Sequence, residues 1–213
     1  MNVLVTGFEP FGGESVNPSA LLLENLPSRV AGHPVHTQLL PTAFGHSLEV
    51  LCAALERLKP EVTLLTGEAG GRAYISAEQV AINLQDARIP DNSGFQPQDQ
   101  EIEVGGPDGL FSTLPVQQVV TRLRSAGIPA QRSLSAGAFV CNYCFYGLMR
   151  RLPTAAPTGI GGFVHLPYLP EQAARHLGSP SMAADLQSRA IRLALEVCLE
   201  QIELRGSKAA RPD

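Results

Sequence analysis

The sequence predicts an α/β protein, a single-domain three-layer α/β/α sandwich built on a twisted, mixed and mostly parallel sheet. Short apolar runs alternate with segments of helical periodicity, which is typical of strand–helix–strand units. Several of the short runs are apolar throughout, as expected of strands buried on both faces. The 213 residues are 44% hydrophobic and 17% charged, which suffices for one large core. We expect one domain over residues 1–205 and a flexible tail over residues 206–213.

Turn residues separate the elements expected in the first half of the chain. These elements are strands over residues 3–6, 35–40 and 62–66, helices over residues 18–26 and 46–58, and an extended segment over residues 75–84. The first strand ends at Gly7 and the third at Gly67. Asn17 and Pro18 are residue types preferred at the N-cap and the first position of a helix.

The alternation of strands and helices continues in the second half. The expected elements are helices over residues 116–126, 142–152 and 182–204 and strands over residues 130–133 and 162–165. Residues 86–109 are rich in Gly, Pro and Asp and are expected to form a long loop. Loops of this length without regular structure are uncommon in compact domains and are often functional.

Composition and charge exclude several classes of function. The net charge is −4 and the chain has no basic run, so we expect no nucleic-acid or membrane partner. No apolar stretch approaches the ~18 to 20 residues of a membrane span, and the start of the chain lacks the basic segment of a signal peptide. Four cysteines are too few for a disulfide scaffold in a chain of this length. We therefore expect a soluble protein of the reducing cytoplasm.

Residue types suited to ligand binding follow several of the expected strands. In open α/β sheets, ligands bind beyond the carboxyl ends of the strands. Glycine, aromatic and titratable residues gather there, in the segments 7–13, 67–72, 135–141 and 165–168. Neither glycine-rich segment has the Gly-Lys-Ser/Thr ending of a phosphate loop or the spacing of a dinucleotide fingerprint. We expect tight turns in both segments and no nucleotide cofactor.

Cys141 is the leading candidate for a reactive residue. It stands at the start of an expected helix, where exposed N–H groups and the helix dipole lower the pKa of a thiol. The alternative is a buried cysteine that packs as a small hydrophobe. Cys52 and Cys198 fall on apolar helix faces, and we expect both in the core.

Cys141 and Cys144 also form a C-x-x-C pair, which leaves a thiol–disulfide function open. A zinc site needs further ligands, and the chain has no second C-x-x-C and no H-x-x-x-H, so we expect no metal. Cys144 lies three residues into an apolar helix, where packing explains it better.

His165 and Glu78 are candidates for the groups that activate such a cysteine. A thiol nucleophile needs a base, and the imidazole needs a third polar group to orient it. His165 ends an apolar strand, and Glu78 is an isolated carboxylate in the mostly apolar run over residues 75–82. The alternatives are a core histidine bonded to backbone and the polar face of an edge strand. Only the fold can bring the three residues together.

Long motifs occur in order along the chain. They are G-F-E-P-F-G-G over residues 7–13 with Asn17-Pro18, A-G-G-R over 69–72, Glu78 with V-A-I-N over 80–83, D-A-R-I-P-D-N over 86–92, S-A-G over 135–137 with F-V-C-N over 139–142, and H-L-P-Y-L-P over 165–170. This set resembles the bacterial type I pyroglutamyl peptidases, also called pyrrolidone-carboxylate peptidases. The resemblance extends from about residue 2 to the last helix and is highly specific.

The resemblance implies a cytosolic cysteine peptidase that removes an N-terminal pyroglutamyl residue from peptides without a cofactor. It implies that Cys141 is the nucleophile, His165 the general base and acid, and Glu78 the carboxylate that orients the histidine. Position and chemistry select the same three residues. The family often assembles as tetramers, so a homotetramer is expected by resemblance.

The resemblance also implies a pocket for the flat, uncharged lactam ring of the substrate. The implied substrate-binding residues are Phe8, Phe11, Asn17, Glu68, Arg88, Phe139 and Val140. Aromatic walls suit a flat apolar group, and a free N-terminal amine would be buried there without a partner. The oxyanion is expected to rest on backbone N–H groups of Cys141 and of the Arg88 segment. Asn17 has an adequate structural role as an N-cap as well.

Glu68 departs from the family pattern, in which many relatives have glutamine. An ionised Glu68 accepts from the lactam N–H but cannot donate to the lactam carbonyl, whereas a protonated Glu68 does both. We therefore expect Glu68 to contact the ring or its supporting loop and to make binding sensitive to pH.

Two other functions stay open on the sequence. The first is an α/β protein related to nucleoside phosphorylases or binding another small molecule, which phosphate or nucleoside would protect against heat unfolding. The second is a thiol–disulfide protein that uses Cys141 and Cys144. In that protein Cys144→Ser abolishes activity, whereas in the peptidase it leaves turnover near normal.

Overall fold

The computed structural model describes residues 1–156 and 158–209, which form a seven-stranded sheet between two layers of helices. The strands of this sheet are β1 (Val3–Phe8), β2 (Arg29–Val30), β3 (His33–Leu40), β4 (Val62–Glu68), β5 (Ile75–Glu78), β8 (Ala130–Ser133) and β9 (Ile160–Leu166). A separate two-stranded sheet contains β6 (Val80–Ile82) and β7 (Gly109–Phe111). The helices are α1 (Pro18–Asn25), α2 (His46–Leu58), α3 (Val116–Ser125), α4 (Val140–Ala155), α5 (Pro170–Ala173) and α6 (Ala184–Ala209).

The central sheet is mixed and mostly parallel, which confirms the predicted fold class. Its strand order is β2-β3-β1-β4-β9-β5-β8. The four strands from β3 to β9 run parallel to one another, whereas β2 is antiparallel to β3 and β5 is antiparallel to β9. The edge strand β8 is parallel to β5. The strand direction therefore changes between the neighbouring strands β9 and β5.

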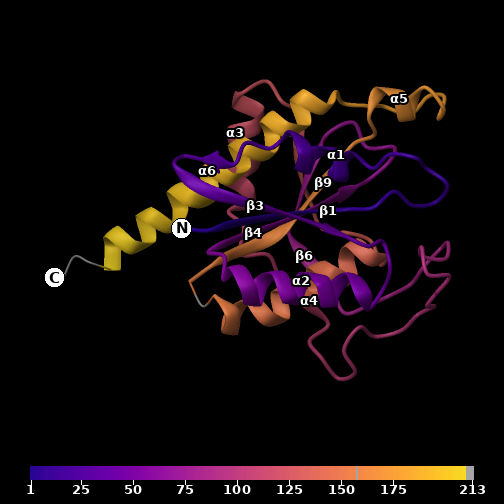
Figure 1. Cartoon of the computed structure of the whole chain (residues 1–213), viewed down its shortest axis with the longest axis horizontal. Coiled ribbons are helices and arrows are strands. Elements are labelled where there is room, and N and C mark those ends of the chain that lie inside the picture. The colour runs from indigo at the N-terminus through magenta and orange to yellow at the C-terminus, as the bar shows by residue number, and fades with distance from the viewer. Residues whose placement is uncertain (157, 210–213) are drawn as a thin grey trace.

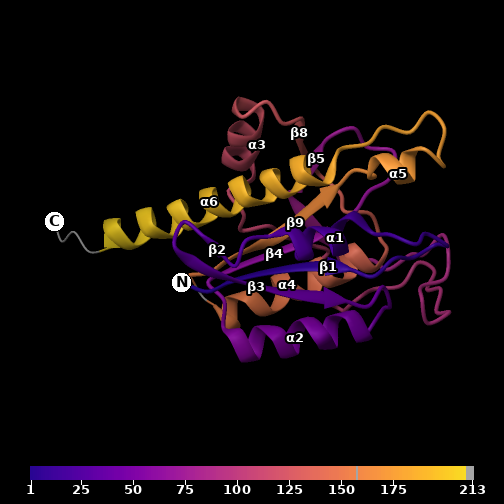
Figure 2. The same cartoon turned by 45° about the horizontal axis from the view of Figure 1, so that its top comes forward.

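Side chains alternate between the two faces of the sheet, and each face has its own core. On β1, Val3 and Val5 pack with α1, α3 and α6, whereas Leu4 and Phe8 pack with α2 and α4. Figures 1 and 2 show the same division, with α2 and α4 on one side of the sheet and α1, α3 and α6 on the other. The helices thus cover both faces, as the uniformly apolar strands predict.

Most of the expected elements are confirmed, and the differences concern short elements and boundaries. The two-residue β2, the three-residue β7 and the four-residue α5 were not expected, because such short segments carry no measurable periodicity. The helix that begins at Val140 starts two residues earlier than expected. The last helix continues to Ala209, so residues 206–209 of the expected tail are helical, and residues 210–213 lie outside the described residues. None of the described helices combines the length and the apolar composition needed to cross a bilayer.

Two glycines expected in turns lie within strands instead, because each lets another segment approach closely. A β-carbon on Gly7 would lie 2.2 Å from the carbonyl oxygen of Ser19 on α1. The same serine accepts a hydrogen bond from the Phe8 N–H (2.9 Å) at its hydroxyl, and Asn17 caps α1 by accepting from the Ser19 N–H, as expected. On the other face of the sheet, Gly67 of β4 leaves room for Cys141 in the same way. The segments that follow, Gly12-Gly13 and Gly70-Gly71, do form turns.

We expect Gly7→Ala to destabilise the protein by about 3 kcal/mol, because the added methyl group collides with backbone that cannot move without displacing α1. The matched control is Gly13→Ala, where the φ angle is +84° but no atom lies within 4 Å of the added carbon. Backbone strain alone costs about 1 kcal/mol there. Urea unfolding of both variants measures the difference, and equal losses would contradict the packing argument.

Candidate active site

A cavity of about 430 Å³ lies where β4 and β9 end, at the carboxyl edge predicted to bind ligands. The expected site residues that line it are Phe11, Glu68, Arg88, Phe139, Cys141 and His165. They come from the loop after β1, the end of β4, the long loop, the start of α4 and β9. The cavity therefore collects residues from distant parts of the chain.

His165 and Glu78 form a hydrogen bond behind this cavity. The Nδ1 atom of His165 lies 2.8 Å from Oε1 of Glu78, and the two residues are 4% and 0% exposed. Ser76 lies opposite His165 in the antiparallel pairing of β5 with β9. Glu78, two residues further along β5, is therefore the diagonal neighbour of His165 on the α4 side of the sheet. The sequence alternative of a histidine bonded to backbone is therefore wrong. Because Nδ1 is engaged by Glu78, Nε2 is the imidazole nitrogen left for the cavity.

Glu78 is held as a carboxylate in spite of its burial. Burial by itself raises the pKa of Glu78. Polar interactions with His165, Ser133 and Arg72 outweigh burial, so that the pKa of this carboxyl lies below its usual value of 4.5. The Arg72 guanidinium donates from Nη1 to the same oxygen that contacts His165, at 2.9 Å. The alternative that Glu78 lies on the polar face of an edge strand is wrong, since β5 is an inner strand.

Cys141 is the second residue of α4 and is partly exposed to the cavity. The Tyr143 N–H donates to the Phe139 carbonyl at 3.1 Å, which is the first bond of the helix. The Cys141 N–H therefore has no partner within the helix and remains available to a ligand. Gly67 provides the space for the thiol, because a β-carbon at Gly67 would lie 2.9 Å from the Cys141 sulfur.

The pKa of the Cys141 thiol is shifted in the direction opposite to the one expected. Burial raises the pKa of Cys141 above its usual value, and the nearby Cys144, Glu68 and Glu78 raise it further. The helix N-terminus was expected to lower this pKa, but the apolar surroundings of the sulfur outweigh it. Within the part of the chain that the structure describes, no hydrogen bond joins Cys141 to His165. Cys141 and His165 both line the cavity, and burial favours the neutral form of the thiol.

One wall of the cavity is aromatic. The rings of Phe11 and Phe139 lie 5.8 Å apart, centroid to centroid, and both line the cavity. Phe44 supports Phe139 from behind, edge to face at 5.4 Å. This wall presents flat apolar surface to a ligand, as expected for Phe11 and Phe139.

Glu68 is one of the polar residues that line the cavity. The buried Gln172 of α5 accepts from the Leu169 N–H at 3.0 Å through Oε1, which fixes its amide orientation. Its Nε2 then donates to Oε2 of Glu68 at 2.7 Å. Burial raises the pKa of Glu68, although the Gln172 hydrogen bond opposes this. Sequence reasoning missed Gln172, because a glutamine near a Pro-initiated helix carries no recognisable signal.

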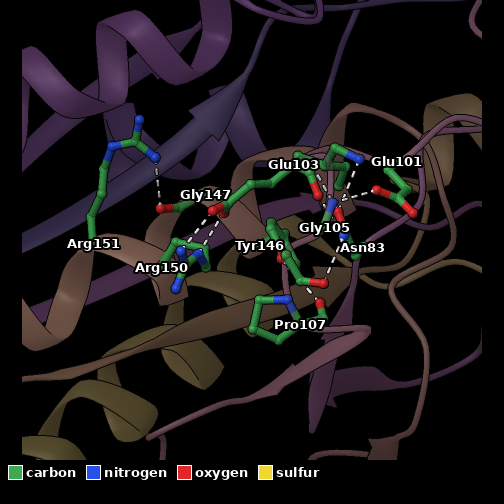
Figure 3. Close-up of polar contacts among 11 residues, drawn as sticks. Asn83, Glu101, Glu103, Gly105, Pro107, Tyr146, Gly147, Arg150 and Arg151 are labelled. Atoms are coloured by element: carbon green, nitrogen blue, oxygen red, sulfur yellow. Dashed lines mark hydrogen bonds and ion pairs between the residues drawn. The ribbon is translucent and has the colours of Figure 1, made fainter.

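The long loop over residues 86–109 is anchored to α4 at its base. Figure 3 shows this network, in which Arg150 makes a two-pronged ion pair with Glu103 at 2.5 and 2.6 Å. Tyr146 donates its hydroxyl to a loop carbonyl at 3.0 Å, and the Asn83 side chain accepts from the Glu103 N–H at 2.9 Å. The anchored loop confirms the expectation of an irregular segment here.

The first part of the same loop reaches the cavity. Asp86 and Arg88 are exposed and line its mouth. The Asp86 N–H donates to the Ala138 carbonyl at 2.9 Å, which ties the loop to the segment leading into α4. Arg88 is therefore at the edge of the cavity and not at its floor.

Three of the expected substrate-binding residues lie outside the cavity lining. Phe8 is 2% exposed and stacks on Phe163 in the core, and Val140 is 0% exposed. Neither side chain lines the cavity in this structure, and their contact with the substrate stays a prediction. Asn17 is 1% exposed and donates from Nδ2 to the Glu9 carbonyl at 3.1 Å, which supports the loop that carries Phe11.

Asn142, next to Cys141, is a structural residue that the sequence analysis did not single out. It is fully buried, and its amide both accepts from the Ile82 N–H (3.0 Å) and donates to the carbonyls of Ile82 and Leu84 (2.9 Å each). It therefore pins the start of α4 to the chain that follows β5. The signal that could have found it is a polar residue on an otherwise apolar helix face.

Cys141 and Cys144 of the C-x-x-C pair are not joined by a disulfide in this structure. Cys144 is fully buried in the core, and all four cysteines are free. Among the residues that the structure describes, no group of three or more His, Cys, Asp or Glu side chains has the arrangement of a metal site.

We expect the ionised Glu78 to stabilise the fold. Because its pKa is lower in the folded than in the unfolded protein, this contribution is present above pH 4.5 and is lost as the pH falls through the folded value. Glu78→Gln should therefore unfold with a free energy that depends less on pH below 4.5, as measured by urea unfolding from about pH 3 to 7. Glu24→Gln, at an exposed position on α1, is the control and should keep the wild-type slope. Identical slopes for Glu78→Gln and the wild type would contradict the assignment.

Comparison with known proteins places this site in a family. The sequence model of a family described as pyroglutamyl peptidase matches residues 1–201. A pyrrolidone-carboxylate peptidase of Klebsiella pneumoniae is 52% identical over 200 residues, covering 93% of each chain. The crystal structure of pyroglutamyl peptidase I from Bacillus amyloliquefaciens is 41% identical, with a TM-score of 0.89 over 92% of this chain and 94% of that one. A mutant pyrrolidone carboxyl peptidase from Pyrococcus furiosus has a TM-score of 0.91 at 41% identity, covering 95% of this chain and all of that one. The chain belongs to the pyroglutamyl peptidase family.

Proposed function

We propose that this protein is a cysteine exopeptidase that hydrolyses the bond after an N-terminal pyroglutamyl residue. The observation that carries this proposal is the convergence of Cys141, His165 and Glu78 at one cavity, in a chain of the pyroglutamyl peptidase family. A nucleophile, a base and an orienting carboxylate are the parts that nucleophilic catalysis needs. The family match favours this function over a phosphorylase-like binding protein and a thiol–disulfide protein.

The proposed reaction proceeds through a thioester. Nε2 of His165 takes the proton of the Cys141 thiol as the sulfur attacks the pyroglutamyl carbonyl carbon. The C–N bond then breaks, and His165 gives the proton to the leaving amine. In the second half, His165 takes a proton from water, hydroxide attacks the thioester, and the C–S bond breaks. The released thiolate recovers its proton from His165, which restores the free enzyme.

Glu78 serves this cycle by holding His165 in one tautomer. A carboxylate that accepts from Nδ1–H keeps Nε2 unprotonated at the start and stabilises the imidazolium that forms during attack. Because burial raises the pKa of the Cys141 thiol, the proton transfer to His165 is assigned to the first step. The oxyanion is proposed to rest on the Cys141 N–H at the start of α4, with a second donor from the Arg88 segment.

The aromatic wall suits the lactam ring of pyroglutamate. Phe11 and Phe139 offer flat apolar surface for a flat, uncharged ring, and Glu68 offers the polar group for its N–H or carbonyl. A peptide with an ordinary N-terminal amine would place an unpaired charge in this cavity, which disfavours its binding. The proposed partners are therefore peptides that begin with pyroglutamate.

The family resemblance also leads us to propose a homotetramer in the cytoplasm. Four free cysteines support a reducing compartment. Light scattering of the purified protein measures the assembly directly, and a monomer at micromolar concentration would contradict it.

We expect Cys141→Ala to abolish release of a fluorophore from a pyroglutamyl amide, with a loss of at least about 10⁴-fold in kcat. Cys144→Ala is the matched control in the same helix, and its turnover should stay within about threefold of the wild type because this residue only packs. Inactivity of both variants, with both folded by circular dichroism, would favour the thiol–disulfide alternative.

We expect Glu68 to make substrate binding depend on pH. Gln172 occupies Oε2, so the free Oε1 contacts the lactam, as a donor when Glu68 is protonated and as an acceptor when it is ionised. Its raised pKa places this change above pH 4.5. The kcat/KM profiles of the wild type and Glu68→Gln should differ there by up to about tenfold, the contribution of one hydrogen bond to a charged group. Superimposable profiles would overturn this role of Glu68.

A further inference from the structure

Arg72 lies between two parts of the site without belonging to the three residues of the proposed reaction. It follows the turn after β4, where Gly71 adopts a φ angle of +83° and the Arg72 N–H donates to the Ala69 carbonyl at 3.3 Å. From this turn the guanidinium reaches Glu78 on β5 at 2.9 Å. Its second terminal nitrogen lies 3.5 Å from the carbonyl of Ser135, in the segment that leads into α4. Arg72 thus links the strand that carries Glu78 to the segment that carries Cys141.

The Glu78 carboxylate depends on few partners. Its Oε1 receives both Arg72 Nη1 and His165 Nδ1, whereas its Oε2 has no hydrogen-bond partner among the described residues. Glu78 is 0% exposed, so water does not replace a lost partner easily. A buried carboxylate without a counter-charge becomes protonated or turns toward other donors. Either change removes the acceptor that His165 Nδ1 requires.

We propose that Arg72 is a positioning residue for the reaction, which holds Oε1 of Glu78 ionised and turned toward His165. This proposal rests on the proposed function. Two donors that converge on one oxygen fix the rotation of the carboxylate, and the permanent charge of arginine favours its ionised form. Arg72 also lines the cavity, and its charge lowers the pKa of the Cys141 thiol, whereas its hydrogen bond is made to Glu78.

Four groups face or influence the Glu78 carboxylate from the surrounding elements. They are Arg72 from the turn after β4, His165 from β9, Ser133 from the aligned position of β8, and the Cys141 thiol from α4. Of these, Arg72 alone carries a charge at every working pH. Its removal therefore raises the pKa of Glu78, and the acid limb of activity, which requires ionised Glu78, moves to higher pH.

The test compares Arg72→Gln, Arg72→Lys and the control Arg132→Gln. Arg132 is exposed on β8 and aligned with Ala77 of β5, so the control removes the same charge near the same strand without touching Glu78. We expect Arg72→Gln to move the acid limb of kcat/KM for a pyroglutamyl amide up by about one pH unit and to lower kcat about tenfold. Arg72→Lys should keep the wild-type acid limb and recover part of kcat, and Arg132→Gln should match the wild type.

A purely structural role for Arg72 would lower the unfolding midpoint without moving the acid limb, and that result would overturn the proposal. A limb that moves equally in Arg72→Gln and Arg72→Lys would overturn it as well, since lysine keeps the charge. If Arg72→Gln does not fold, the lysine variant decides alone. Its limb must coincide with that of the wild type.

A second measurement separates this proposal from the proposed function. Alkylation of Cys141 by iodoacetamide needs the same proton transfer to His165 but no peptide substrate. Its rate against pH, read by mass spectrometry on the peptide that contains Cys141, should show the same upward shift in Arg72→Gln. A wild type that cleaves no pyroglutamyl amide would refute the proposed function, while the alkylation profiles would still confirm or overturn the role of Arg72.

Discussion

The buried hydrogen bond between His165 and Glu78 is the interaction on which the rest of the site depends. Both residues are almost fully removed from water, so each needs the hydrogen bond that the other provides. The reversal of chain direction between β9 and β5 creates the diagonal pairing that brings the two side chains together on one face of the sheet.

The pairing determines what else the local structure requires. The imidazole faces the α4 side, so a nucleophile must come from α4, and Cys141 in the first turn of that helix meets this requirement. The thiol fits only because Gly67 leaves room above the adjacent strand. Asn142 fixes the start of α4 through three hydrogen bonds to backbone. Packing thus assembles the site. Its chemistry depends on the groups that packing leaves without a hydrogen-bond partner among the described residues, such as the Cys141 N–H and Nε2 of His165.

The sequence predicts the layers of the fold well, because apolar runs and helical periodicity are local signals. His46–Leu58 and Ala130–Ser133 agree with their expected bounds for this reason. The direction of β5 is not a local property, so the route by which Glu78 reaches His165 could not be foreseen. The same holds for the pKa of Cys141, since desolvation by surrounding residues opposes the helix-start effect that the sequence shows. For Phe8 and Val140, which are buried outside the cavity lining, the motif indicates importance without distinguishing a substrate contact from a support.

The central claim is that Cys141 forms a thioester with the pyroglutamyl group. The most direct measurement is rapid acid quenching of the enzyme during turnover of an activated pyroglutamyl ester, followed by mass spectrometry of the protein and its peptides. The account predicts a population heavier by one pyroglutamyl group, with the added mass on the peptide that contains Cys141 and absent from Cys141→Ala. Rapid turnover of the ester by the wild type without any such adduct, or an adduct on another residue, would contradict it.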